Sequence, residues 1–231
     1  MTSYLWTPPP APSLPVRGKT ERLPVNRLFF VGRNYHAHAV EMGKPVDKSV
    51  ERPFYFTKSP QTLLESGATM PYPSETKNFH FEMELVVAIG KPGFRVKAED
   101  AHQIIYGYAA GLDMTRRDLQ LKLRDKGRPW ELGKAFDQSA PIGPLRPASR
   151  IGHPTAGAIW VKLDGQDRQR SDIAKLIWSV PEVIANLSTY FELRPGDLIF
   201  TGTPEGVGSV QVGQTMLGGI DGLGELSVRV I

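Results

Sequence analysis

Residues 81–90 read FEMELVVAIG and place two carboxylates, one residue apart, at the start of an apolar run. Such a run is typical of a buried β-strand, on which side chains two residues apart point to the same face. We therefore expect Glu82 and Glu84 to share one site. Two ionised carboxylates on an apolar strand repel each other and lose hydration, so a hard cation or a shared proton must compensate. The alternative is an edge strand with one face in water.

A second apolar run, residues 104–113, ends in a third acid, Asp113. It predicts a strand with Asp113 at its end and a helix that starts at Thr115. Taken alone, Asp113 could be a turn residue before that helix, where Thr115 and Asp118 resemble a capping box. Three acids on neighbouring strands would instead supply an oxygen-rich half-shell suited to Mg²⁺ or Mn²⁺. A zinc site is disfavoured because the chain has no cysteine and no paired histidine spacing.

The composition indicates one domain with many turns between short elements, because 231 residues include 23 Gly and 20 Pro. The elements favour an α+β, mainly β fold over a parallel nucleotide-binding sheet. Residues 1–25 form a Pro-rich N-terminal arm, and residues 26–231 form a single domain. The lack of cysteine fits a reducing compartment, and residues 1–12 do not resemble a signal peptide, so we expect a cytoplasmic protein.

The charge pattern argues against nucleic acid and membranes as partners. The formal net charge is +4, but the basic residues are scattered among acidic ones rather than gathered in a block. No apolar run approaches the length that spans a bilayer. We interpret the excess charge as surface charge, part of which guides a small anionic substrate.

Local signals place other elements around these two strands. Strands are predicted at residues 27–32, 54–58 and 158–163, and the Asp164-Gly165 pair after the last of them predicts a hairpin. A core-packing helix is predicted to begin at Ser179, with Glu182 three residues later as a capping box.

A histidine and a glutamate three residues apart are candidates for acid–base chemistry. On a helix His38 and Glu41 share one face, and a carboxylate beside an imidazole orients the ring and raises its basicity. A general base that activates water needs this arrangement. The alternative is an ordinary surface pair, and the role of His36, which faces elsewhere, is left open.

Further candidates lie after Asp113. Lys134 sits in an apolar, aromatic neighbourhood, where it could offer positive charge to an enolate or oxyanion, or could simply extend to the surface. Arg117 and Gln120 could reach substrate oxygens from the predicted helix. The TGTPEGVG stretch at residues 201–208 could present backbone N–H groups to a carboxylate, and it matches no nucleotide-binding loop.

Taken together, these segments resemble the short single-domain branch of the fumarylacetoacetate hydrolase family, whose motifs occur in the same order from residue 31 to residue 208. The matching segments are Val31-Gly-Arg-Asn-Tyr-x-x-His38-x-x-Glu41, Phe56-x-Lys58-x-Pro60, His80-x-Glu82-x-Glu84, Gly107-Tyr108 through Gln120, Gly127-x-Pro129-Trp130 through Phe136, and Thr201-Gly-Thr-Pro-x-Gly-Val-Gly208.

The resemblance implies a mixed β-sandwich or β-roll, usually a homodimer, with Mg²⁺ or Mn²⁺ as cofactor. It implies metal ligands at Glu82, Glu84 and Asp113, water activation by His38 with Glu41, and charge stabilisation by Lys134. The substrate-binding residues that we expect are Arg33, Lys58, Arg117, Gln120 and Thr203.

The activity expected from the resemblance is hydrolysis of a carbon–carbon bond in an acylpyruvate. The expected substrate is 3-fumarylpyruvate, cleaved to fumarate and pyruvate in aromatic catabolism. The alternative on the same scaffold is an oxaloacetate decarboxylase or a homoprotocatechuate-pathway decarboxylase or isomerase. A ligand-binding protein without activity is disfavoured because the candidate ligands, the His38–Glu41 pair and Lys134 are all present.

Overall fold

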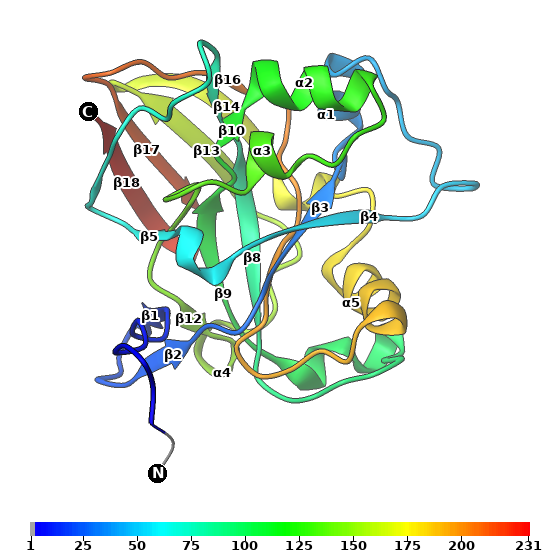
Figure 1. The fold of residues 1–231 in the computed structure, drawn as a ribbon. Helices are drawn as coiled ribbons and strands as arrows, with labels where there is room; N and C mark the ends of the chain where they lie inside the picture. The colour runs from blue at the N-terminus through cyan, green and yellow to red at the C-terminus, as the bar shows by residue number, and fades with distance from the viewer. Residues whose placement is uncertain (1–2) are drawn as a thin grey trace.

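Strands dominate the computed structural model, which describes residues 3–231 (Figure 1). Over these residues the strands form sheets of eight, five, three and two members. The eight-stranded sheet has the order β4-β3-β15-β8-β9-β11-β5, and β12 also pairs with β9. In that order its strands span Phe54–Lys58, Leu28–Gly32, Leu198–Phe200, Met83–Ile89, Ile105–Leu112, Ala140–Ile142 and Leu63–Glu65, and β12 spans Arg146–Pro147.

Within residues 3–231 the fold also contains three smaller sheets. The five-stranded sheet comprises β14 (Gln166–Asp172), β13 (Ala158–Leu163), β17 (Thr215–Ile220), β18 (Gly224–Val230) and β6 (Thr69–Met70). The three-stranded sheet comprises β10 (Thr115–Arg116), β7 (Phe79–Phe81) and β16 (Gly208–Ser209), and a hairpin pairs β1 (Ser13–Pro15) with β2 (Arg22–Pro24). Parallel pairs such as β3 with β15 occur beside antiparallel ones, so the mixed, mainly β architecture predicted from the sequence is confirmed.

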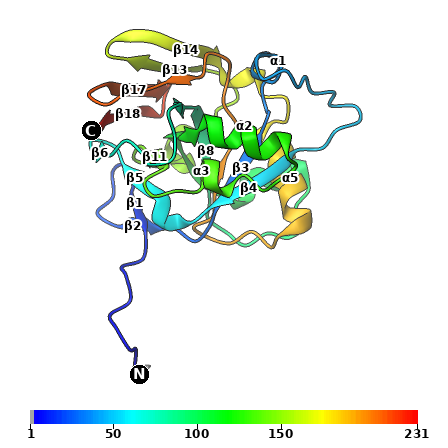
Figure 2. The same ribbon diagram turned by 45° about the horizontal axis from the view of Figure 1, so that its top comes forward.

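The helices are short and lie around the sheets. They are α1 (His36–Glu41), α2 (Arg117–Asp125), α3 (Glu131–Lys134), α4 (Ala148–Ile151) and α5 (Val180–Tyr190), with 3-10 turns at Pro60–Thr62, Ala98–Ile104 and Ile173–Lys175. Helices α2 and α3 lie together (Figure 2); α2 packs beside β7 and β10, and α3 packs beside β10 and β4. The predicted capping box of Ser179 and Glu182 is present at the start of α5. Among residues 3–231, no helix has the length and hydropathy that a bilayer span requires.

The large sheet is buried on both faces, which explains why β8 is a continuous apolar run rather than an alternating one. Leu85 and Val87 belong to a core cluster that includes residues of α5, whereas Val86 and Ala88 belong to a second cluster. Leu14 of the N-terminal hairpin is also in this second cluster, so the chain from Ser13 onward packs on the body. Residues 3–12 extend away from it (Figure 2).

Antiparallel pairing of β8 with β9 brings the predicted acids together. Glu84 lies opposite Gly111, and the backbone N–H of Asp113 donates to the carbonyl of Glu82 at 2.8 Å. Because side chains alternate along each strand, this register puts Glu82, Glu84 and Asp113 on one face. Gly111 has no side chain to intrude, and a Cβ added there would meet Phe200 at 2.6 Å.

Two boundaries differ from those predicted. The strand expected over residues 81–90 is divided at Glu82, so that β7 pairs in the three-stranded sheet and β8 in the large one. The helix expected from Thr115 begins at Arg117, because Thr115 and Arg116 pair with β7 instead. Asp118 accepts hydrogen bonds from Thr76 and the backbone of Lys77, so no Thr115–Asp118 capping box forms.

Asn34 connects the end of β3 to two other segments near the site. Its fully buried side chain donates to the carbonyls of Trp178 and Thr201 at 2.9 and 2.8 Å, and accepts from the Trp178 N–H at 2.7 Å. These bonds join α1, the start of α5 and the loop after β15.

We expect Asn34→Ala to lower the free energy of unfolding by about 3 kcal/mol, because buried backbone groups lose their partner. Chemical denaturation measures this loss. The control is Gln103→Ala, which removes one exposed hydrogen bond to Asp100 and should cost less than about 1 kcal/mol. Equal losses in the two variants would contradict the connecting role of Asn34.

Candidate active site and metal centre

Three buried carboxylates form the centre of the site. Glu82, Glu84 and Asp113 each offer an oxygen, and these oxygens lie within 4.8 Å of one another. Less than a tenth of each residue is exposed. The structure thus brings together the three acids that the sequence singled out.

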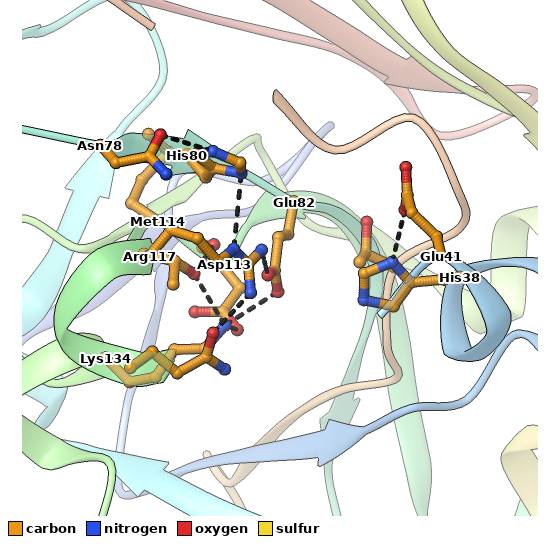
Figure 3. A network of polar contacts seen from close by, with 12 residues as sticks. His38, Glu41, Asn78, His80, Glu82, Asp113, Met114, Arg117 and Lys134 are labelled. Atoms are coloured by element: carbon orange, nitrogen blue, oxygen red, sulfur yellow. Dashed lines mark hydrogen bonds and ion pairs between the residues drawn. The ribbon is translucent and has the colours of Figure 1, made fainter. Parts of the chain in front are cut away.

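Buried cationic side chains compensate two of the three acids (Figure 3). Lys134 Nζ donates to Glu82 Oε2 at 2.8 Å, to Asp113 Oδ2 at 2.5 Å and to Thr115 Oγ1 at 2.7 Å. Arg117 forms an ion pair with the other oxygen of Glu82. Lys134 is 2% exposed, so the surface position that is usual for a lysine does not apply here.

Lys58 is a second buried lysine beside Asp113. Its Nζ lies 2.7 Å from Asp113 Oδ1 and donates to the carbonyls of Met114 and Ser139 at 3.1 and 2.7 Å. Burial lowers the pKa of Lys58 to about 8, although Asp113 opposes this effect. Lys58 therefore holds the end of β9 in place as well as contributing charge.

The electrostatic environment of Glu84 differs from that of Glu82. Burial and then the neighbouring Asp113 and Glu82 carboxylates raise the pKa of Glu84, whereas Lys134 and Arg117 outweigh burial and lower the pKa of Glu82. Glu84 Oε2 accepts the Gly202 N–H at 2.8 Å. Within residues 3–231, Glu84 has no ion pair, which leaves the cluster short of positive charge at this point.

This donor set fits a hard divalent cation. All three groups are carboxylates, which Mg²⁺ and Mn²⁺ prefer, and the cluster opens on a cavity that leaves space for further oxygen ligands. A cation at this position would relieve the repulsion that raises the pKa of Glu84.

Gly202 shapes the loop that contacts Glu84. Its φ of +99° is disfavoured for other residues, and a Cβ at this position would lie 2.7 Å from the Cβ of Asn34. The loop at residues 201–208 therefore donates a backbone N–H to a carboxylate of the protein itself.

His38 lines the same cavity as the acids, and Glu41 lies on the side of His38 away from Glu82 (Figure 3). His38 Nδ1 is 3.0 Å from Glu41 Oε2, and His38 is 6% exposed. If Nδ1–H donates to Glu41, Nε2 is left as a proton acceptor. Glu41 Oε1 also accepts the Gly206 N–H at 3.2 Å. His36 is exposed and does not line the cavity.

A cavity of about 420 Å³ joins these groups. Its wall includes the predicted residues Arg33, Arg117, Gln120, Lys134 and Thr203, whereas Lys58 lies behind it. Thr203 is fixed by a hydrogen bond from Gln169 at 2.9 Å. Arg33 is held by Glu51 at 3.1 Å and by the carbonyl of Lys44 at 3.2 Å.

Sequence reasoning missed several residues of the wall. These side chains are Met42, Lys44, Phe54, Phe56, Arg124 and Trp130. Phe54 meets Trp130 edge-on with ring centroids 5.5 Å apart, and Phe56 lies 5.9 Å from the same ring. A helical periodicity from Arg117 could have indicated Arg124, whereas the aromatic contacts depend on the tertiary fold.

Comparison with known proteins shows extensive similarity. Residues 27–231 match the model of the fumarylacetoacetate (FAA) hydrolase C-terminal family. The chain is 59% identical over 189 residues to a fumarylpyruvate hydrolase of Ralstonia sp., covering 82% of this chain and 98% of that protein. It is 39% identical over 204 residues to a mitochondrial oxaloacetate tautomerase of Arabidopsis thaliana, covering 88% and 90%.

A solved structure agrees with the sequence relatives. The fumarylpyruvate hydrolase of Pseudomonas aeruginosa, in complex with Mn²⁺ and pyruvate, superposes with a TM-score of 0.95 at 57% identity, and the match covers 99% of both chains. The β-roll expected from the resemblance is therefore confirmed.

His80 supports Arg117 behind the cluster and was not singled out as a candidate from the sequence. Its Nε2 lies 2.8 Å from the Asn78 side-chain oxygen, and Arg117 Nε donates to Nδ1 at 3.4 Å, which requires a neutral ring. Burial, with a further contribution from Arg117, lowers the pKa of His80 to about 4.

We expect His80 to destabilise the fold in acid. Below pH 6.5 the unfolded chain takes up a proton that the folded chain binds only near pH 4, so stability falls as pH decreases between these values. Allowing for partial exposure, the loss is about 2 kcal/mol. Denaturation curves at several pH values measure it. His80→Gln should flatten the dependence relative to wild type and to the exposed control His36→Gln, and identical slopes would contradict this role.

Proposed function

The chain belongs to the fumarylacetoacetate hydrolase family, and on that premise we propose that it hydrolyses a carbon–carbon bond in an acylpyruvate. The proposed substrate is 3-fumarylpyruvate, and the products are fumarate and pyruvate. The observation that carries the proposal is one cavity lined by both the carboxylate cluster and His38, whose ring contacts Glu41. The 59% identity to a fumarylpyruvate hydrolase supports the choice of acyl group.

The metal centre of this proposal consists of Glu82, Glu84 and Asp113 holding Mg²⁺ or Mn²⁺. When bound, a divalent cation supplies sites for the carboxylate and 2-oxo oxygens of the substrate and positive charge beside the future enolate. The Mn²⁺ and pyruvate of the Pseudomonas aeruginosa protein support this assignment.

His38 acts as the general base in the proposed reaction. Its Nε2 takes a proton from water while Glu41 fixes the ring through Nδ1. The hydroxide oxygen bonds to the 4-keto carbon, and the bond between carbons 3 and 4 then breaks. Its electron pair passes to the pyruvate fragment as an enolate. Protonation of carbon 3 yields pyruvate, and the acyl fragment leaves as fumarate.

Cationic and polar side chains hold the pyruvate end. Lys134 lies beside Glu82 and Asp113, where its charge favours an enolate over the neutral keto form. Arg117 and Gln120 line the cavity next to the acids and are placed to bind a carboxylate. Thr203 and Arg33 line other parts of the wall, and Lys58 supports Asp113 from behind.

Oxaloacetate chemistry is the second candidate. Decarboxylation of oxaloacetate develops the same pyruvate enolate, and its tautomerisation passes through the analogous enolate of oxaloacetate itself. The 39% identity to an oxaloacetate tautomerase favours this candidate. The hydrolase remains the better supported function because the fumarylpyruvate hydrolase is the more similar relative.

A cytoplasmic homodimer is part of the proposal. The absence of cysteine supports the location, and the resemblance supports the dimer.

The metal proposal predicts stabilisation by divalent cations. Mn²⁺ at 100 times its Kd should raise the free energy of unfolding by about 2.7 kcal/mol, and a chelator should reverse the effect. Glu84→Gln should lose most of this stabilisation because a ligand and its charge are removed. Thermal unfolding with and without Mn²⁺ measures the effect. The control Glu99→Gln changes an exposed glutamate and should respond like wild type; an unaltered response in Glu84→Gln would contradict the metal assignment.

The hydrolase proposal predicts release of equal amounts of fumarate and pyruvate from 3-fumarylpyruvate with Mg²⁺ or Mn²⁺. Product chromatography measures both acids. The same measurement with oxaloacetate as substrate detects the competing decarboxylation through release of pyruvate. His38→Gln should lower kcat by about 100- to 10,000-fold because the general base is lost. His36→Gln is the control and should retain wild-type rates. Cleavage of no acylpyruvate by the wild-type protein would refute the hydrolase function.

A further inference from the structure

Helix α2 presents three polar side chains to the cavity at positions i, i+3 and i+7. Arg117, Gln120 and Arg124 all line the wall, whereas Asp118 and Asp125 are exposed. Residues with this spacing lie along one face of a helix. Arg117 lies beside the carboxylate cluster. Arg124 lines the same cavity at the other end of α2.

Arg124 has little to bind within the protein. Its Nε and one terminal nitrogen contact Asp125 at 3.0 and 2.9 Å, but Asp125 is its neighbour in sequence and its side chain is 64% exposed. A pair of this kind contributes little and is easily exchanged for another anion. By contrast, Arg117 is bound to Glu82 and Gln120, and Arg33 is bound to Glu51.

The spacing along α2 exceeds the length of a dicarboxylate by less than the reach of an arginine side chain. Seven residues at 1.5 Å per residue separate Arg117 and Arg124 by about 10 Å along the axis. An extended 3-fumarylpyruvate measures about 7 Å between its carboxylate carbons, given about 3.5 Å for each three bonds of an extended chain. Two arginine side chains inclined toward the cavity can therefore each reach one carboxylate.

Aromatic side chains line the same cavity and suit the unsaturated middle of such a substrate. Phe54 and Phe56 each pack against Trp130 in the cavity wall, and the three rings offer mainly flat apolar surfaces. A planar conjugated acyl chain can lie against these rings and continue toward a cationic group.

We propose that Arg124 binds the distal carboxylate of the acyl group and makes the enzyme selective for diketo acids that carry a second carboxylate. This inference rests on the proposed hydrolase function and adds the class of acyl group to it. A guanidinium suits the task because its planar fork can bind a carboxylate through two parallel hydrogen bonds. Lys44 also lines the cavity, but it lies on the loop after α1 rather than on a helix.

The test compares 3-fumarylpyruvate with acetylpyruvate, which has the same pyruvate end but no distal carboxylate. For Arg124→Gln we expect the ratio of kcat/KM for 3-fumarylpyruvate to that for acetylpyruvate to fall about 30-fold, mainly through KM. Arg124→Lys should recover part of the ratio. Lys126→Gln removes the same charge from the exposed end of α2, outside the cavity wall, and should leave the ratio within about two-fold.

Product inhibition gives a second readout. Fumarate should inhibit Arg124→Gln at least 10-fold more weakly than wild type, whereas inhibition by pyruvate should change little. An unchanged ratio, an equal loss with both substrates, or a larger effect on the ratio from Lys44→Gln would overturn the assignment to Arg124 while the hydrolase function stands. Cleavage of neither substrate by the wild-type protein would refute the function and this inference together.

Discussion

The burial of three carboxylates beside three cationic side chains is the constraint on which the structure of the site depends. Each of these charges would be costly alone in the interior, and Lys134 is shared between two of the carboxylates. Glu82, Asp113, Lys58, Lys134 and Arg117 compensate one another, whereas Glu84 has a backbone N–H as its partner. A divalent cation would give the cluster a net positive charge, which suits an anionic keto acid.

The surrounding fold fixes these charges on rigid elements. Glu84 and Asp113 are held by the β8–β9 register, and Lys58 stands at the end of β4, next to β3 in the large sheet. Lys134 comes from α3 and Arg117 from α2, so the cationic side chains approach from segments remote in sequence from β8. Such positioning by strands and helices favours precise geometry over flexibility.

The sequence was sufficient for the parts of the site that follow local periodicity. Alternation on strands placed Glu82 and Glu84 on one face, and helical spacing placed Glu41 beside His38. The break of the strand at Glu82 could not be predicted, because it follows from the pairing of β7 with β10 and β16. Lys134 was a candidate from the sequence, but its hydrogen bonds to distant residues could not be predicted, and neither could the aromatic wall of Phe54 and Trp130. Resemblance to a family supplied the roles that local pattern left open.

The loop between Thr201 and Gly208 contacts both halves of the site, since Gly202 donates to Glu84 and Gly206 donates to Glu41. This loop of eight residues thus connects the acid cluster to the proposed base. A shift of this loop would move the hydrogen-bond donors of both Glu84 and Glu41. A change in the loop is therefore expected to affect the carboxylate cluster and the proposed base together. Substitutions in this loop are therefore restricted to those that keep both hydrogen bonds.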